Sequence, residues 1–169
     1  GDMVWDRYWV DNKYSFAEYI EEMKPVAGLP FFHTPGNHDH DLWESGDFAT
    51  MAKYKQNIGP SYYSYNLGKV HGVVLDDIDC ANPGTGKNAT YTNNLVQEQL
   101  DWLKKDLSHV SKDTPIIVSM HAQMFANPGT GQTPNYAMTA SSASQLEDIL
   151  DDFTTVHIFT GHTHKMYNV

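Results

Sequence analysis

Three short apolar runs in this chain each lead into residues that can bind a metal ion. The runs cover residues 29–34, 116–120 and 156–160, and they are followed by Gly36-Asn37-His38-Asp39, by His121 and by Gly161-His162-Thr163-His164. Runs of this length are typical of buried strands. Ligands of open α/β sheets collect outside the carboxyl ends of the strands. We therefore expect these polar residues, together with Asp2 of the opening Gly1-Asp2, to meet at one edge of a sheet.

A histidine taken alone is more often a surface or core residue than a metal ligand. Here, however, His162 and His164 stand two positions apart at the end of one predicted strand, and His121 and Asn37 follow two others. Because the same arrangement recurs four times along the chain, the pattern favours a metal site over isolated structural histidines.

The segments between these motifs predict an α/β fold with no internal repeat and no domain boundary over residues 1–169. Ser15 and Glu18 form a capping box for a helix that ends before Pro25. Residues 62–67 and 70–75 predict a hairpin around Gly68-Lys69. Two further helices are expected from apolar residues at helical spacing, one on Val96, Leu100, Leu103 and Leu107, the other opened by Ser144 and Glu147 and carrying Leu146, Ile149, Leu150 and Phe153.

The motif series resembles that of the calcineurin-like metallophosphoesterases, including bacterial members. It runs, in family order, as GDMVWD (1–6), GNHD (36–39), MHAQ (120–123) and GHTH (161–164), and it covers nearly the whole chain. The resemblance implies a layered β-sandwich flanked by helices. The first family motif, DxH, does not occur, so we expect a partial domain that is incomplete at the N-terminus and also at the C-terminus.

The resemblance also implies a centre of two divalent or trivalent metal ions, Mn, Fe or Zn, whose shared hydroxide attacks phosphorus. In this family Asp2 would bridge the two ions, and Asn37, His121 and His162 would complete the second. His164 would bind the first ion, together with the Asp and His of the missing DxH motif. On its own, therefore, this chain is expected to bind at most about one metal at this centre and to be a poor enzyme.

His38 is implied as the catalytic residue that faces the phosphoryl group without binding metal. Some family members orient this histidine with the second Asp of GDxxD, but Trp5 occupies that place here and Asp6 follows one position later. Either Asp6 orients His38 from a longer turn or another group replaces it. Asp39 is expected to brace its own loop. His33 and His40 stay open as supporting or substrate contacts. Structural or surface roles are expected for the remaining histidines, which are His71, His109 and His157.

The composition of the chain limits which kinds of partner it can bind. The net charge of −10 argues against long nucleic acid, which binds through a Lys/Arg surface. A small phosphorylated substrate fits better, and Tyr136 in the Gly/Asn-rich loop 126–139 is a candidate contact. No segment approaches the ~20 apolar residues of a membrane span. The only cysteine, Cys80, is expected to be a structural thiol. A bacterial periplasmic or secreted location is the expectation, with any signal peptide upstream.

These observations predict a metal-dependent hydrolase of phosphoric esters. Two alternatives remain open. One is a phosphodiesterase that acts on a nucleotide or a lipid head group. The other is a catalytically dead binding module that keeps the same scaffold. An upstream DxH segment would favour the enzyme, and its absence the binding module. The sequence leaves the oligomeric state undetermined.

Overall fold

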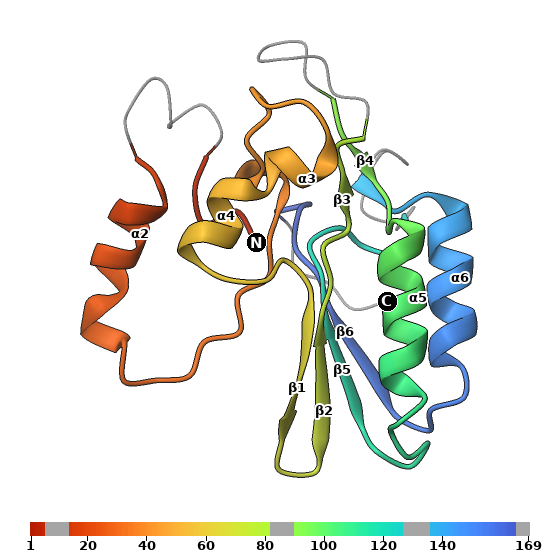
Figure 1. Cartoon of the computed structure of the whole chain (residues 1–169). Helices are drawn as coiled ribbons and strands as arrows, with labels where there is room; N and C mark the ends of the chain where they lie inside the picture. Colours follow the sequence, from red (N-terminus) through yellow and green to blue (C-terminus); the bar gives the residue numbers. More distant parts are fainter. Residues whose placement is uncertain (6–13, 82–89, 127–135, 165–169) are drawn as a thin grey trace.

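A four-stranded mixed sheet forms the centre of the computed structural model, which describes residues 1–5, 14–81, 90–126 and 136–164. The strands lie in the order β1-β2-β5-β6 (Figure 1). β1 pairs with β2 antiparallel, whereas β2, β5 and β6 run parallel to one another. The bounds are β1 (Tyr63–Leu67), β2 (Val70–Val74), β5 (Ile116–Ser119) and β6 (Val156–Phe159). The α/β fold predicted from the sequence is confirmed.

The β1–β2 hairpin forms as predicted. Leu67 pairs with Val70 across the turn, and Gly68 takes the left-handed φ of 61° that a tight turn requires. At the far end of the hairpin Tyr63 pairs with Val74. The hairpin therefore sets the register of β2, the first of the three parallel strands.

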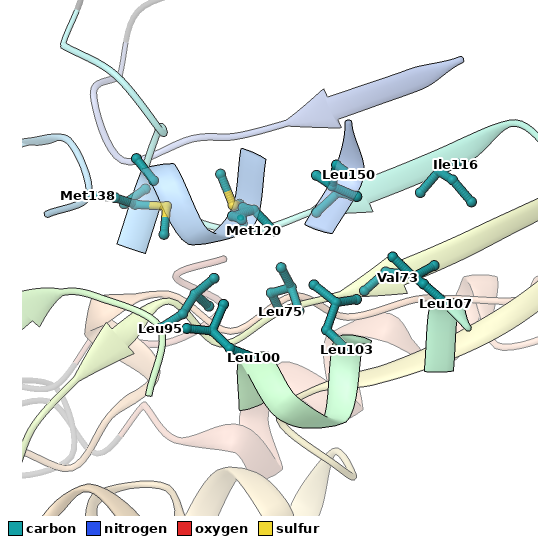
Figure 2. Close-up of a cluster of buried hydrophobic side chains, with 14 of the residues drawn as sticks. Val73, Leu75, Leu95, Leu100, Leu103, Leu107, Ile116, Met120, Met138 and Leu150 are labelled. Atoms are coloured by element: carbon teal, nitrogen blue, oxygen red, sulfur yellow. The ribbon is translucent and has the colours of Figure 1, made fainter. Parts of the chain in front are cut away.

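Helices α5 (Gln97–Leu107) and α6 (Ala140–Leu150) cover one face of the sheet (Figure 1). Their apolar faces meet β2 and β5 in the main core, where Leu103, Ile116 and Leu146 have no exposed area (Figure 2). α6 begins four residues before the start expected at Ser144, because the Thr139 hydroxyl accepts a hydrogen bond from the Ser142 amide and caps the helix. The first turn of α6 consists of small residues, which give no apolar period to predict it.

The N-terminal helix α2 (Phe16–Met23) has the expected capping box. The Ser15 amide donates to the Glu18 carboxylate at 2.8 Å, and the 3₁₀ turn η1 (Lys24–Val26), which contains Pro25, follows the helix. Phe16 packs edge-on against Tyr54 in a second, smaller core. Tyr54 lies on α4 (Ala52–Asn57), which follows the short α3 (Asp47–Thr50).

Two predicted buried strands differ from the structure. Residues 29–34 form no strand, and Leu29 is 63% exposed, because none of the described segments pairs with this backbone. Phe32 instead stacks on Tyr65 of β1 at 3.6 Å between ring centroids. β6 is buried on one face only: Val156 and Ile158 pack against the core, whereas Phe159 points to the other face and is 62% exposed. The only other sheet in the described part of the chain is the pair β3 (Ile78–Asp79) and β4 (Thr92–Asn93).

His71 has the structural role expected from the sequence. Its ring is buried on β2, with Nε2 2.9 Å from the Asp106 carboxylate and Nδ1 2.9 Å from the Asn66 amide oxygen. These contacts join the hairpin to the end of α5. Within the described residues, no helix combines the length and apolar character that a membrane crossing needs.

Replacement of Leu103 by Ala is expected to lower the free energy of unfolding by about 2–5 kcal/mol, because it leaves a cavity between α5 and the sheet. Urea unfolding followed by circular dichroism measures the change. Lys104→Ala on the exposed face of the same helix is the control and should stay within about 0.5 kcal/mol of wild type. Equal effects of the two substitutions would contradict the packing described here.

Candidate functional site

The candidate site lies where the three parallel strands end. Parallel strands present their carboxyl ends at one edge, so the residues after β2, β5 and β6 come together there. These residues are Asp76 and Asp77 after β2, His121 after β5 and His162 after β6. The 3₁₀ turn η2 (Asn37–Asp39) of the GNHD loop adds Asn37.

Four side chains converge into a cluster that we call the histidine centre: Asp2, Asn37, His121 and His162. The Asn37 amide oxygen lies 2.9 Å from His121 Nε2 and 3.1 Å from His162 Nδ1. The two ring nitrogens are 3.1 Å apart, and Asp2 Oδ2 is 3.2 Å from His121 Nε2. Ligands bonded to one ion at about 2.0–2.2 Å lie about 3 to 3.5 Å from one another. The donor set and its spacing therefore fit a metal ion.

The protonation states also suit metal binding. Burial, together with a smaller effect from the neighbouring His121, lowers the pKa of His162 to about 4, so the His162 ring is neutral near pH 7. Burial raises the pKa of Asp2, but hydrogen bonding to His121 and its charge outweigh burial and bring the value to about 2. A neutral imidazole and an ionised carboxylate are the forms that metal ions bind.

The loops that carry these residues are strained. Asp2, His162 and His164 have positive φ of 60°, 62° and 52°, a region that costs a non-glycine residue of order 1–3 kcal/mol. Such outliers concentrate at functional sites. His164 is exposed on this loop and interacts electrostatically with His162, but the contacts of the described residues do not bring it into the cluster.

Asp39 braces the GNHD loop, in the way the sequence suggested. One carboxylate oxygen accepts from the backbone amides of Asp2 and Gly36, both at 2.8 Å, and the other accepts from Val4 at 3.1 Å. Asp39 is completely buried. Gly36 packs so closely that an added Cβ would lie 2.9 Å from Cε1 of His121. The loop thus fits tightly against the histidine centre.

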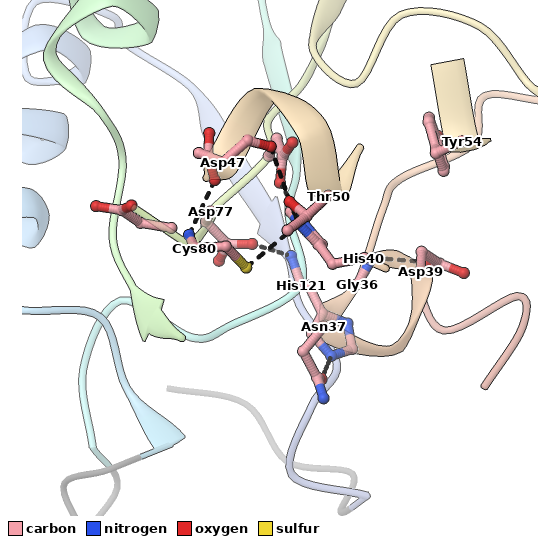
Figure 3. Close-up of polar contacts among 12 residues, drawn as sticks. Gly36, Asn37, Asp39, His40, Asp47, Thr50, Tyr54, Asp77, Cys80 and His121 are labelled. Atoms are coloured by element: carbon pink, nitrogen blue, oxygen red, sulfur yellow. Dashed lines mark hydrogen bonds and ion pairs between the residues drawn. The ribbon is translucent and has the colours of Figure 1, made fainter. Parts of the chain in front are cut away.

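Asp77 has an equivalent role that the sequence reading missed. Its buried carboxylate accepts from the backbone amides of His121 at 2.9 Å and Ala122 at 2.7 Å, which fixes the turn that carries His121 (Figure 3). The signal was present in the sequence, because Asp76-Asp77 follows an apolar strand in the same way as the recognised motifs do.

His38 lies beside the cluster. Its amide donates to the Asp2 carboxylate at 3.0 Å, and its ring stacks on Trp5 with centroids 3.9 Å apart and planes inclined by 12°. Trp5 thus contacts the histidine that other family members orient with an Asp. Asp6, which was expected as one candidate for that role, lies outside the described residues.

Of the candidate substrate contacts, Tyr136 remains near the site, with its ring edge-on to His162 at 5.3 Å. His40 does not remain a candidate contact, because its ring is completely buried against Asp76, Thr50 and Cys80. Burial excludes a substrate contact and leaves the supporting role that was the other expectation. His33 forms a hydrogen bond with Tyr19, with its Nε2 3.1 Å from the Tyr19 hydroxyl oxygen.

Replacement of Asp39 by Asn is expected to weaken metal binding at the histidine centre by about 10- to 100-fold, as is typical when a group that positions ligands is lost. Asn has one carbonyl oxygen and cannot accept all three backbone bonds. Calorimetric titration of the metal-free chain with Mn²⁺ measures the change. Asp113→Asn, on the surface, is the control. Unchanged affinity in a folded Asp39→Asn variant would show that the brace does not position the ligands.

Comparison with known proteins agrees with this geometry. Purple acid phosphatase 15 of Arabidopsis thaliana is 26% identical over 170 residues, which cover 95% of this chain and 27% of that protein. Purple acid phosphatase 13 of the same plant is 23% identical over an alignment of 180 residues. This alignment covers 97% of this chain and 28% of that protein. The chain thus spans just over a quarter of the length of these relatives. The family model for calcineurin-like phosphoesterases matches residues 1–166, and the chain belongs to that family.

Proposed function

We propose that this chain carries the histidine half of a binuclear metal centre that hydrolyses phosphoric esters. The observation that carries the proposal is the convergence of Asn37, His121 and His162 around a common point, with the ionised Asp2 carboxylate beside them. Oxygen and nitrogen donors without thiolate suit Mn, Fe or Zn. Membership of the calcineurin-like phosphoesterase family supports metal-dependent hydrolysis of phosphoric esters.

When bound, the metal ions would supply positive charge for the phosphoryl oxygens and lower the pKa of a water molecule. His38 is the general acid in this proposal, since it lies next to Asn37 and is not needed as a ligand. The Trp5 ring keeps the imidazole of His38 parallel to its own plane. The Asp2 carboxylate accepts a hydrogen bond from the His38 amide and so holds the GNHD loop next to Asp2.

The substrate in this proposal is a small phosphomonoester. Both curated relatives are named phosphatases, which favours a monoester over a diester. The net charge of −10 removes the surface attraction that a polyanion would need. Parallel assays with an aryl phosphate and the corresponding diaryl phosphate distinguish the two classes. Faster turnover of the diester would favour the phosphodiesterase alternative.

His38→Ala is expected to lower kcat by about 10² to 10⁴, the range for an acid–base group, and to leave the metal content unchanged. His162→Ala, in contrast, should reduce the metal content because it removes a ligand. Steady-state assays with an aryl phosphate and elemental analysis of the same samples measure both. His157→Ala, an exposed histidine on β6, is the matched control. Loss of metal from His38→Ala would make His38 a ligand and overturn its catalytic role.

The 169-residue chain is expected to bind about one metal ion at the histidine centre and to turn over slowly. At this centre the described residues offer one full ligand set, for the second metal ion. The family pattern leaves only Asp2 and His164 for the first metal ion. Fusion of a strand that carries a DxH motif to the N-terminus should raise both the activity and the metal content at this centre. Full activity without such a segment would show that other residues replace it.

A further inference from the structure

A second cluster of metal-binding side chains lies behind the GNHD loop. Among the described residues, His40, Asp47 and Cys80 each offer one donor atom, and the three atoms all lie within 4.8 Å of one another. The residues come from three segments: the end of the GNHD loop, the first residue of α3 and the residue after β3. His40 and Cys80 have no exposed area. Figure 3 shows the three side chains directed toward one another.

The spacing between Cys80 and His40 matches one pair of ligands in a tetrahedral site. Cys80 Sγ lies 3.5 Å from His40 Nδ1. With Zn–S near 2.3 Å and Zn–N near 2.0–2.1 Å, a tetrahedral zinc ion places its sulfur and nitrogen ligands about 3.5 Å apart. The Thr50 hydroxyl is 3.1 Å from the same Nδ1 and donates to the Asp47 carbonyl oxygen, so Thr50 links His40 to the start of α3 beside the cluster.

A second, independent feature is the support of the His40 ring. Nε2 lies 3.2 Å from the carboxylate of Asp76, which is 8% exposed. Histidines that bind metal through one nitrogen generally donate the other N–H to a carboxylate in this way. The Asp47 carboxylate is held in turn, because Oδ1 accepts from the Cys80 amide at 2.9 Å.

The cluster also lies among acidic groups. The Asp47 carboxylate interacts electrostatically with Asp76 and Asp79, and Asp76 contacts the His40 ring. A cation held between these carboxylates would be attracted by all three.

We propose that His40, Asp47 and Cys80 bind a zinc ion at a structural site separate from the histidine centre, with Asp76 orienting His40. Thiolate and imidazole donors select zinc among the common divalent ions. The ion would join the GNHD loop, α3 and the end of β3 behind the loop that presents Asn37. The proposal does not depend on the hydrolytic activity.

The single cysteine makes the test specific. The histidine centre has no sulfur ligand, so any metal–thiolate signal from this chain reports Cys80 alone. X-ray absorption of the zinc-loaded chain should show a sulfur neighbour at about 2.3 Å, and Co²⁺ should give a thiolate charge-transfer band. Both signals should disappear in Cys80→Ser, with the loss of one zinc per chain. In His162→Ala the thiolate signal should remain while zinc at the histidine centre is lost.

Two further variants and one control complete the design. In a zinc titration followed by the thiolate signal, His40→Ala and Asp47→Ala should each lower the zinc affinity at least tenfold. His71→Gln, at a buried histidine elsewhere, should leave this affinity unchanged. Circular dichroism confirms folding, and the wild-type spectrum decides the question even if a variant fails to fold. A folded, zinc-saturated wild type with no sulfur neighbour would overturn the proposal. So would a signal that survives the loss of both His40 and Asp47, because zinc would then bind Cys80 adventitiously.

Discussion

The parallel pairing of β2, β5 and β6 fixes the positions of Asp77, His121 and His162 at one edge of the sheet. Its backbone hydrogen bonds continue past the strand ends into the site, from Leu75 to Ser119 at 2.9 Å, from Met120 to Phe159 at 3.1 Å and from Gly161 to His121 at 2.8 Å. A slip of one residue would reverse which side chains face the core. The same slip would separate His121 from His162, so the register that packs the core also brings these two histidines of the histidine centre together.

Buried carboxylates connect this rigid edge to the irregular loops. Asp39 and Asp77 accept five backbone N–H bonds between them, and each fixes a turn that carries a residue of the histidine centre. Loss of these bonds would leave buried backbone donors unsatisfied, which costs more than the bonds themselves contribute. Side chains that never touch a substrate thus set the precision of the centre.

Much of this arrangement was predictable from local patterns. The α5 helix, the Ser15 capping box and the β1–β2 hairpin follow from spacing within a few residues, and they were predicted correctly. An apolar run does not reveal whether another strand will pair with it, which is why residues 29–34 were misread. The grouping of His40 with Cys80 joins positions 40 residues apart that share no motif. Only the folded chain brings such residues together.

The left-handed backbone at Asp2, His162 and His164 has a consequence for the lifetime of the protein. Strain that is present before any ion arrives lowers the stability of the metal-free chain, whereas an ion that binds only the folded form raises it in proportion to the logarithm of its free concentration. The balance between folded protein and degradation would therefore follow the metal supply of the compartment. A chain built in this way would accumulate where the metal is available and be cleared where it is scarce.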